Sequence, residues 1–336
     1  MVAVAVTDAG LLDTVPNDYV TARRLITRTL GIAAIQRIHK QDPFRDWPAI
    51  IVQPAIFTIL VVALTRLSFG PLWLACFVLQ GFMLQILGYT THDLFVHRRV
   101  AGRRFGYALG VLFQLPVFYR RTWYALYHLD HHEYMGTERD TEAYKQDLDT
   151  RWKRFLCLTV VGFALARGRK LKPSHAVAPE IGKGPLKMPT DPTILRRLRR
   201  ERFIVRIVAA ALVPLSILWW QPVILGFVLP LLIVVPVAGM VRLILEHGEV
   251  NPKSIFNCAT FYRTGLVSRL LFFWDAGDCH IVHHIYPAIP FYRMGEALAL
   301  IRPILLAQGA RERRSLAALL YGFFIRNEPH RTLWSR

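Results

Sequence analysis

Two stretches of the sequence repeat one arrangement of histidines. Residues 128–132 read HLDHH, and residues 280–284 read HIVHH. In both, the histidines stand at positions i, i+3 and i+4, which lie on one face of a helix. Each stretch therefore directs three imidazoles toward one small volume. Because neutral imidazole is a good ligand for zinc, copper, iron and nickel, the two repeats indicate a metal site.

Three further histidines extend this pattern. His92 and His97 lie at the end of an apolar segment, and His247 follows another, so nine of the twelve histidines fall in four clusters beyond apolar runs. Nine nitrogen donors exceed the four ligands of one tetrahedral zinc and suit two metal ions with four or five nitrogens each. His92 and His97 are about 140° apart on an ideal helix, so we expect the helix to end between them or the two to bind different metals.

The residues around the histidines indicate which metal chemistry to expect. The clusters contain no obvious carboxylate bridge of the four-helix Glu/His type. An almost all-imidazole site at a membrane surface favours iron used for oxygen chemistry. Histidine ligands also need acceptors that fix their tautomer and orientation, and Asp130, Glu246 and Asp278 lie beside the clusters as candidates.

The composition indicates a membrane protein. The chain has 336 residues, of which 53% are apolar, and a formal net charge of +19. It is too apolar for an ordinary soluble enzyme. The charge alone would suit a nucleic-acid-binding protein, but the basic residues avoid the short loops between apolar runs: Arg66 is the only one near residues 66–70, and residues 219–222 contain none. This distribution follows the positive-inside rule, so no nucleic-acid partner is expected.

Apolar runs predict the topology. About 20 residues cross the hydrocarbon core, and four runs are candidates: residues 49–65, 71–91, 203–219 and 222–241. Their short connections make two hairpins, so both termini and all four histidine clusters are expected on the cytoplasmic face. The predicted fold is an all-α integral membrane protein with four transmembrane helices in two hairpins. A cytoplasmic helical cap, residues 92–202 and 243–336, holds the His-rich dimetal site. Arg206 and Arg242 are expected to snorkel from helix ends.

Two segments outside the predicted spans have recognisable sequence patterns. Residues 1–48 are expected to form a cytoplasmic or interfacial segment ahead of a membrane domain, residues 49–336, with an amphipathic helix at 19–39 on the membrane surface. Residues 167–202 are expected to be a basic linker that ends in RRLRR at 196–200. Such a block is either the cytoplasmic flank of a span or a site for anionic headgroups or an acidic partner.

The four histidine motifs together resemble those of a known family. HDLFVH at 92–97, HLDHH at 128–132, the segment around Glu246 and His247, and HIVHH at 280–284 resemble the histidine boxes of the membrane fatty acid desaturase superfamily. YPAIPFY at residues 286–292 resembles that family's continuation after its last box. The resemblance covers about residues 70–295, with all boxes in order and at suitable separations.

The resemblance implies a ligand set and its cofactors. Carried over by position, the iron ligands would be His92, His97, His128, His131, His132, His247, His280, His283 and His284. The family implies two iron ions, molecular oxygen as co-substrate, and electrons from a separate ferredoxin or cytochrome b5-type donor. An acyl chain would enter a tunnel beside the spans. The chain departs from the family at Leu243, where stearoyl-CoA-type members carry an asparagine, and at Asp278 and Val282, where many members carry asparagine and glutamate.

The implied function is an oxygen-dependent desaturase that introduces a double bond into a fatty acyl or similar lipid-like chain. A hydroxylase or ketolase of the same superfamily is the alternative, because these reactions could share one oxidant. The spacing HxxxxH at residues 92–97 is more similar to acyl desaturases than to alkane hydroxylases or carotenoid ketolases. A metal transporter is disfavoured, because the spans contain no histidine before their cytoplasmic ends. A non-catalytic zinc-binding membrane protein is a remote alternative.

Overall fold

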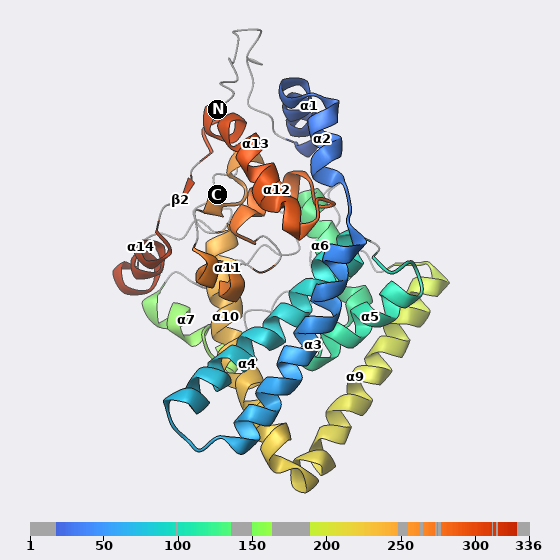
Figure 1. The fold of residues 1–336 in the computed structure, drawn as a ribbon, viewed down its shortest axis with the longest axis vertical. Coiled ribbons are helices and arrows are strands. Elements are labelled where there is room, and N and C mark those ends of the chain that lie inside the picture. The colour runs from blue at the N-terminus through green and yellow to red at the C-terminus, as the bar shows by residue number, and fades with distance from the viewer. Residues whose placement is uncertain are drawn as a thin grey trace, which may run out of the picture.

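The computed structural model describes residues 18–98, 100–135, 150–162, 189–247, 255–262, 265–272, 274, 277–310, 312–313 and 315–327. The other residues, among them 1–17 of the expected N-terminal segment and 136–149 and 163–188 of the expected cap, lie outside the described part of the chain. The described residues are mostly helical. Long helices form one end of the molecule and a layer of shorter helices forms the other (Figure 1).

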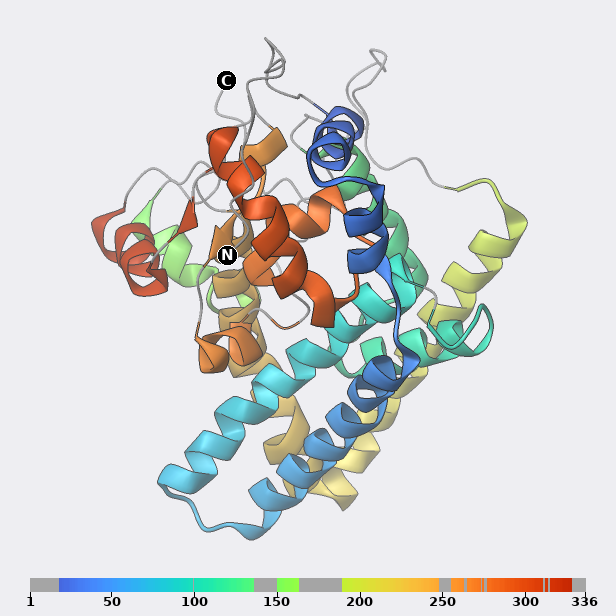
Figure 2. The ribbon, with the colours of Figure 1, turned by 45° about the horizontal axis from the view of Figure 1, so that its top comes forward.

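The long helices are α3 (Pro43–Arg66), α4 (Pro71–Thr90), α9 (Pro192–Leu218) and the continuous pair η4 (Gln221–Val228), a π-helix, and α10 (Leu229–His247). Residues 67–70 join α3 to α4, and these two helices pack against each other. α3 also contacts η4, and α4 contacts α10, so the three apolar segments form one bundle (Figures 1 and 2). α9 packs on η4 and on helix α6 (Arg121–Tyr134).

Local sequence signals set where these helices begin. Asp42 accepts a hydrogen bond from the backbone of Phe44 at 3.1 Å, and Pro43 occupies the first helical position of α3. Asp191 and Pro192 repeat this arrangement at the start of α9. A capping carboxylate satisfies an otherwise free N–H, and proline lacks the N–H that the first turn cannot use. The expected linker at 167–202 is therefore wrong for its last eleven residues, which are helical.

Among the described residues, three helical regions are long and apolar enough to cross a membrane: Ile32–Arg66, Pro71–His97 and Gln221–His247. They contain the predicted spans at 49–65, 71–91 and 222–241. The predicted span at 203–219 covers the last part of α9 and its C-cap, Trp219. α9 is not among the three, because Glu201, Arg202 and Arg206 add charge to its apolar part. Three of the four predicted spans thus lie in helices that could cross a membrane by length and composition.

The other described elements are short. The helices are α1 (Tyr19–Leu30), α2 (Ile32–His39), the π-helix η1 (Thr91–His97), α5 (Phe105–Gln114), η2 (Leu115–Val117), α6, α7 (Arg151–Leu156), η5 (Ile255–Asn257), α11 (Leu266–Phe272), η6 (Gly277–Cys279), α12 (His280–Ile285), η7 (Phe291–Arg293), α13 (Met294–Ala307), α14 (Leu316–Tyr321) and the π-helix η8 (Gly322–Arg326). The two-residue strands β1 (Phe261–Tyr262) and β2 (Glu312–Arg313) pair in parallel.

The N-terminal helices differ from the expected single helix on the membrane surface. Gly31, with φ of +80°, separates α1 from α2, because this backbone conformation is available to glycine at little cost. α1 buries Ala22 and Ile26 against the cluster that contains α12 and α13, so its apolar face packs on protein. The expected domain boundary at residue 48 falls inside α3, and the division of the chain at that point stays a prediction.

The largest cluster of buried apolar side chains lies around α12. Ile281, Val282 and Ile285 of that helix are fully buried between α1 and α13. A well-packed core holds a short helix in one position, because each buried side chain loses contacts if it moves. This six-residue helix, which carries three of the predicted ligands, is therefore fixed by its neighbours rather than by its own length.

Candidate metal centre

The structure brings all nine predicted histidines together in two adjoining groups. The first group is His92, His97, His128, His132 and His283, and the second group is His131, His247, His280 and His284. In the first group, one ring nitrogen from each histidine lies within 4.8 Å of all the others. The two groups meet where the rings of His132 and His284 stack with centroids 4.2 Å apart.

Each HxxHH stretch divides its histidines between the two groups. On α6, the Nε2 atoms of His128 and His132 lie 2.9 Å apart in the first group, whereas His131 belongs to the second. On α12 the assignment is reversed: His280 and His284 belong to the second group and His283 to the first. Positions i+3 and i+4 fall on opposite sides of position i around a helix, so one turn can serve two ions.

A π-helix accounts for the first pair of histidines. The expectation that His92 and His97 are separated by a helix end or bind different metals is wrong, because η1 continues α4 as a π-helix through both. In a π-helix the hydrogen bonds run from residue i to residue i+5, so residues five apart stand above one another. The rings of His92 and His97 accordingly lie 4.6 Å apart in the same group.

The nitrogen positions fit a bound metal better than hydrogen bonding among the rings. Nε2 of His128 lies 2.8 Å from Nε2 of His92, 3.1 Å from that of His97 and 2.9 Å from that of His132. One ring nitrogen carries at most one proton and cannot satisfy three such neighbours. A single cation, in contrast, can accept the lone pairs of all four nitrogens.

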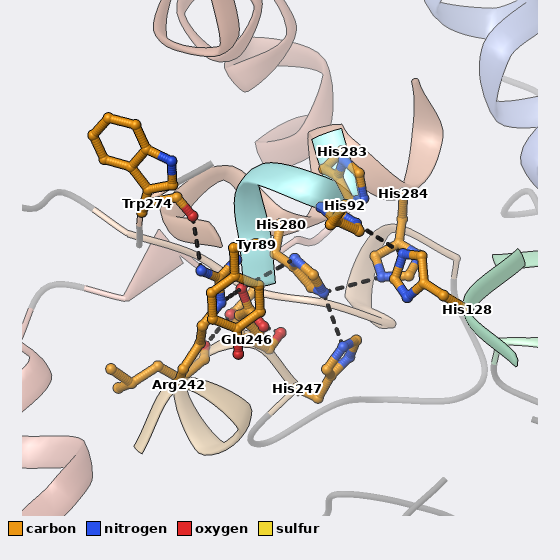
Figure 3. A network of polar contacts seen from close by, with 12 residues as sticks. Tyr89, His92, His128, Arg242, Glu246, His247, Trp274, His280, His283 and His284 are labelled. Atoms are coloured by element: carbon orange, nitrogen blue, oxygen red, sulfur yellow. Dashed lines mark hydrogen bonds and ion pairs between the residues drawn. The ribbon is translucent and has the colours of Figure 1, made fainter. Parts of the chain in front are cut away.

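The nitrogens of the second group approach one another in the same way. Nε2 of His280 lies 2.9 Å from Nε2 of His247 and 3.1 Å from Nε2 of His284 (Figure 3). With metal–nitrogen bonds of about 2.1 Å, neighbouring ligands of one ion stand about 3.0–3.4 Å apart. Both groups therefore place ring nitrogens close enough together to share an ion.

Burial keeps the imidazoles in the state that binds metal. Desolvation, followed by the neighbouring histidines, lowers the pKa of His132, His280, His283 and His284 well below the ordinary value of 6.5. Histidine coordinates metal as the neutral ring, so no proton has to leave these side chains near neutral pH before an ion binds.

The three acidic residues singled out from the sequence occupy different positions. Glu246 is buried at the end of α10, with Oε1 3.6 Å from Nδ1 of His280. Asp130 is buried on α6 beside His131. Asp278 is buried in η6, and its carboxylate lies 3.4 Å from the Arg269 side chain. Glu246 thus lies within ion-pair distance of a ring of the site.

The burial of two arginines near the histidines was not predicted from the sequence. Arg98, directly after His97, bonds Asp93 through Nε at 3.0 Å and Asp46 of α3 through Nη2 at 2.7 Å. Arg242 does not snorkel as expected, because its side chain is only 3% exposed and pairs with Glu246 at 2.6 Å. The i, i+4 spacing of Arg242 and Glu246 was a signal for this pair; nothing in the sequence linked Arg98 to residue 46.

Helix α6 is held by a residue of the basic segment of α9. Glu201 is 1% exposed and accepts hydrogen bonds from the backbone N–H and the hydroxyl of Thr122, and from the Tyr107 hydroxyl at 2.7 Å. A carboxylate at a helix N-terminus satisfies free N–H groups and complements the helix dipole. The position of HLDHH at residues 128–132 thus depends on α9. The part of α9 that contains Glu201 was expected to be a linker.

Comparison with known proteins agrees with this geometry. A family model described as fatty acid desaturase matches residues 68–315, which include both groups of histidines and every helix that carries them. No curated protein matches the chain significantly. The family match covers most of the chain and all four histidine clusters. The chain belongs to the fatty acid desaturase family.

Proposed function

We propose that this chain is an oxygen-dependent desaturase that introduces a double bond into a fatty acyl or similar lipid-like chain with a histidine-ligated diiron centre. The observation that carries the proposal is the convergence of nine buried or half-buried imidazoles in two adjoining groups at one end of a bundle of apolar helices. Membership of the fatty acid desaturase family supports the same reaction class.

The proposed ligands are the two groups themselves, five nitrogens for one iron and four for the other. When bound, the iron pair would supply the oxidising power that removes hydrogen from an unactivated carbon, using molecular oxygen. The histidines hold the pair in place, since each group is contributed by at least three elements packed against one another. α12, buried in the core of the cap, separates the site from water on its side of the molecule.

We further propose that the protein spans the membrane four times, with both termini and the site on the cytoplasmic face. α9 is long enough to cross at about 1.5 Å per residue, and its apolar half ends near Trp219 and Trp220. Large apolar side chains are exposed on the outer faces of these helices: Ile51, Ile59, Val62, Leu74, Val213, Ile217 and Ile233. Exposed apolar bands of this kind are what lipid covers.

The electron donor is proposed to be a separate protein of the ferredoxin or cytochrome b5 type, and the substrate to reach the site from the lipid phase. Both proposals come from the family membership and not from a described contact. The division into an N-terminal segment, residues 1–48, and a membrane domain, residues 49–336, is proposed from the position of the first apolar run in the sequence.

The test compares lipids and acyl metabolites, by mass spectrometry, in cells that express the chain and in cells that express a variant with His283→Ala. We expect products lighter by two hydrogens in the first cells alone. Products heavier by one oxygen would assign the chain to hydroxylation. Identical metabolite profiles, with both proteins present in the membrane at equal amounts, would refute the proposal.

A further inference from the structure

Arg242 is a buried charged side chain near the end of an apolar helical region, Gln221–His247. It lies in α10, one turn before Glu246, and is buried from solvent. Removing a guanidinium from water costs several kcal/mol unless other groups replace the lost hydration. Such a residue in a membrane-embedded helix has a functional role by default, and its partners indicate which one.

The partners of Arg242 come from three separate elements. Nε donates to Oε1 of Glu246 at 2.6 Å, and Nη1 donates to the backbone carbonyl of Trp274 at 2.7 Å. The guanidinium carbon stands 3.3 Å from the ring centroid of Tyr89 on α4 (Figure 3). The planar fork of arginine can make all three contacts at once, which the single ammonium of lysine cannot. Arg242 therefore joins α10, α4 and the segment before the last histidine box.

Glu246 could serve the site in two ways. Its carboxylate lies close enough to His247 and His280 to be a ligand of the second ion. Alternatively, it faces Nδ1 of His280, on the ring edge turned away from the ion, and attracts the proton on that nitrogen. The distances favour the second role: Oε1 of Glu246 faces Nδ1 of His280 at 3.6 Å, whereas Nε2 of His280 faces Nε2 of His247 at 2.9 Å (Figure 3).

We infer that Arg242 is a positioning residue that holds Glu246 against Nδ1 of His280 and keeps this carboxylate out of the metal coordination. The contact fixes the His280 tautomer with the free lone pair on Nε2, aimed into the second group. The second ion is then bound by four imidazoles and no carboxylate. Leu243, on the adjoining turn of α10, has no polar side chain that could serve as a ligand in place of a carboxylate. This inference rests on the proposed function.

The experiment is a titration of the metal-free protein in detergent with Co²⁺, read from its visible absorption and by calorimetry. Wild type should show two binding steps, assigned by His283→Ala for the first group and His280→Ala for the second. Arg242→Met should weaken the second-group step about 10- to 100-fold and leave the first-group step unchanged. A general folding defect would weaken both. Arg206→Met, which replaces an exposed arginine of α9, is the matched control and should change neither step.

Variants of Glu246 separate its two possible roles. Glu246→Gln keeps an oxygen that faces Nδ1 of His280 and should bind close to wild type, whereas Glu246→Ala should weaken the second-group step as Arg242→Met does. If Arg242→Met leaves a buried, unpaired carboxylate and fails to fold, the double variant Arg242→Met with Glu246→Gln removes both charges and should show the second-group loss alone.

Two results would overturn the inference. One is a second-group step in Arg242→Met, or in the double variant, equal to wild type. The other is a Glu246→Gln variant as weak as Glu246→Ala, because the carboxylate would then be a ligand. A wild-type protein that binds fewer than two ions would instead refute the proposed metal centre, which is a distinguishable failure.

Discussion

Adjacent histidines of one helical turn belong to different groups of this site. His131 lies between His128 and His132 on the same turn of α6, yet its ring packs on His247 and His284 of the second group, at 5.1 Å and 4.9 Å between centroids. The division between groups therefore follows the angular position on the helix and not the order in the sequence.

Replacing one histidine at a time should remove one ion at a time. We expect His131→Ala to lose the ion of the second group and His128→Ala to lose the ion of the first, although both residues lie on one helix. Both variants should lose desaturated product, since either ion alone is insufficient. Metal analysis of the purified variants, together with a product assay, measures this.

His39→Ala is the matched control for these variants. His39 lies outside both groups, where Nδ1 contacts the carbonyl of Ile35 and the ring packs against Tyr286. It should retain both ions. Equal loss of both ions from His131→Ala and His128→Ala would mean that these variants damage the helix and not a particular group.

The depressed pKa values predict how acid affects the metal-free protein. Below pH 6.5 the histidines of the unfolded chain take up protons, whereas His132, His280, His283 and His284 stay neutral in the folded state because burial lowers their pKa. Stability should thus fall as the pH drops below 6.5, by up to about 1.4 kcal/mol per pH unit for each such group.

The measurement is the unfolding temperature of the metal-free protein in detergent between pH 7.5 and 5.5. The variant His132→Gln with His284→Gln lacks two of the titrating groups and should show a shallower decline. An unfolding temperature that is constant or rises on acidification would contradict the account.

The sequence predicted the nine histidines but not their grouping. Types and spacing are local properties, and they identified every member of both groups. Which ring joins which group depends on helix type at residues 91–97 and on how α12 packs, and neither follows from a single repeat pattern. The burial of Arg242 was likewise missed, because an arginine near a helix end ordinarily reaches water.

At the scale of elements, a buried ion-pair network supports the first box. Arg98 and its partners Asp46 and Asp93 are each less than 5% exposed, and Arg98 also makes a second contact between Nη2 and Asp93. Asp93 and Arg98 follow His92 and His97 directly in the sequence, so each ligand is adjacent to a fixed charge. The network connects the start of α3 to η1 and holds the π-helical turn in register.

Removing the central charge of this network should destabilise the protein. Arg98→Met leaves two buried carboxylates without their partner, which costs about 3–5 kcal/mol. The variant should unfold at a lower temperature and bind the first-group ion more weakly. Differential scanning fluorimetry and metal analysis in detergent measure both effects.

Arg45→Met serves as the control at the same end of α3. Arg45 and Asp42 form an exposed pair at 3.6 Å, with side chains 61% and 39% exposed, so its loss should cost less than about 1 kcal/mol. If Arg98→Met and Arg45→Met shift the unfolding temperature equally, the network has no structural role.

The sequence predicted the long apolar helices but missed elements that depend on contacts between distant residues. The cores of α3, α4 and α10 are long apolar runs, so composition alone located them. The start of α9 was missed because basic residues between Pro192 and Glu201 are typical of a linker. The Asp191 cap and the contacts of Glu201 with Thr122 and Tyr107 explain why that segment is helical. The break at Gly31 was missed because one glycine is tolerated within many helices.

At the scale of the whole molecule, both groups of histidines lie at one end of the long helices. α4 ends where η1 carries His92 and His97, and α10 ends at His247, whereas residues 67–70 and Trp219–Trp220 lie at the other end of the bundle (Figures 1 and 2). The short loops at that far end contain no charged residue beyond Arg66. This asymmetry is the basis of the proposed orientation.

The orientation can be tested with two single-cysteine additions. Ser68→Cys lies in the exposed connection between α3 and α4, and Thr29→Cys lies on the exposed face of α1. A membrane-impermeant maleimide should label residue 68 in intact cells and residue 29 only after permeabilisation. Labelling of both from the same side would contradict the proposed topology.

Metal analysis of the active protein measures whether nine histidines hold two ions. We expect about two irons per chain in protein that converts its substrate, and parallel loss of iron and activity on chelation. Full activity in protein that contains zinc alone, or no metal, would contradict the account.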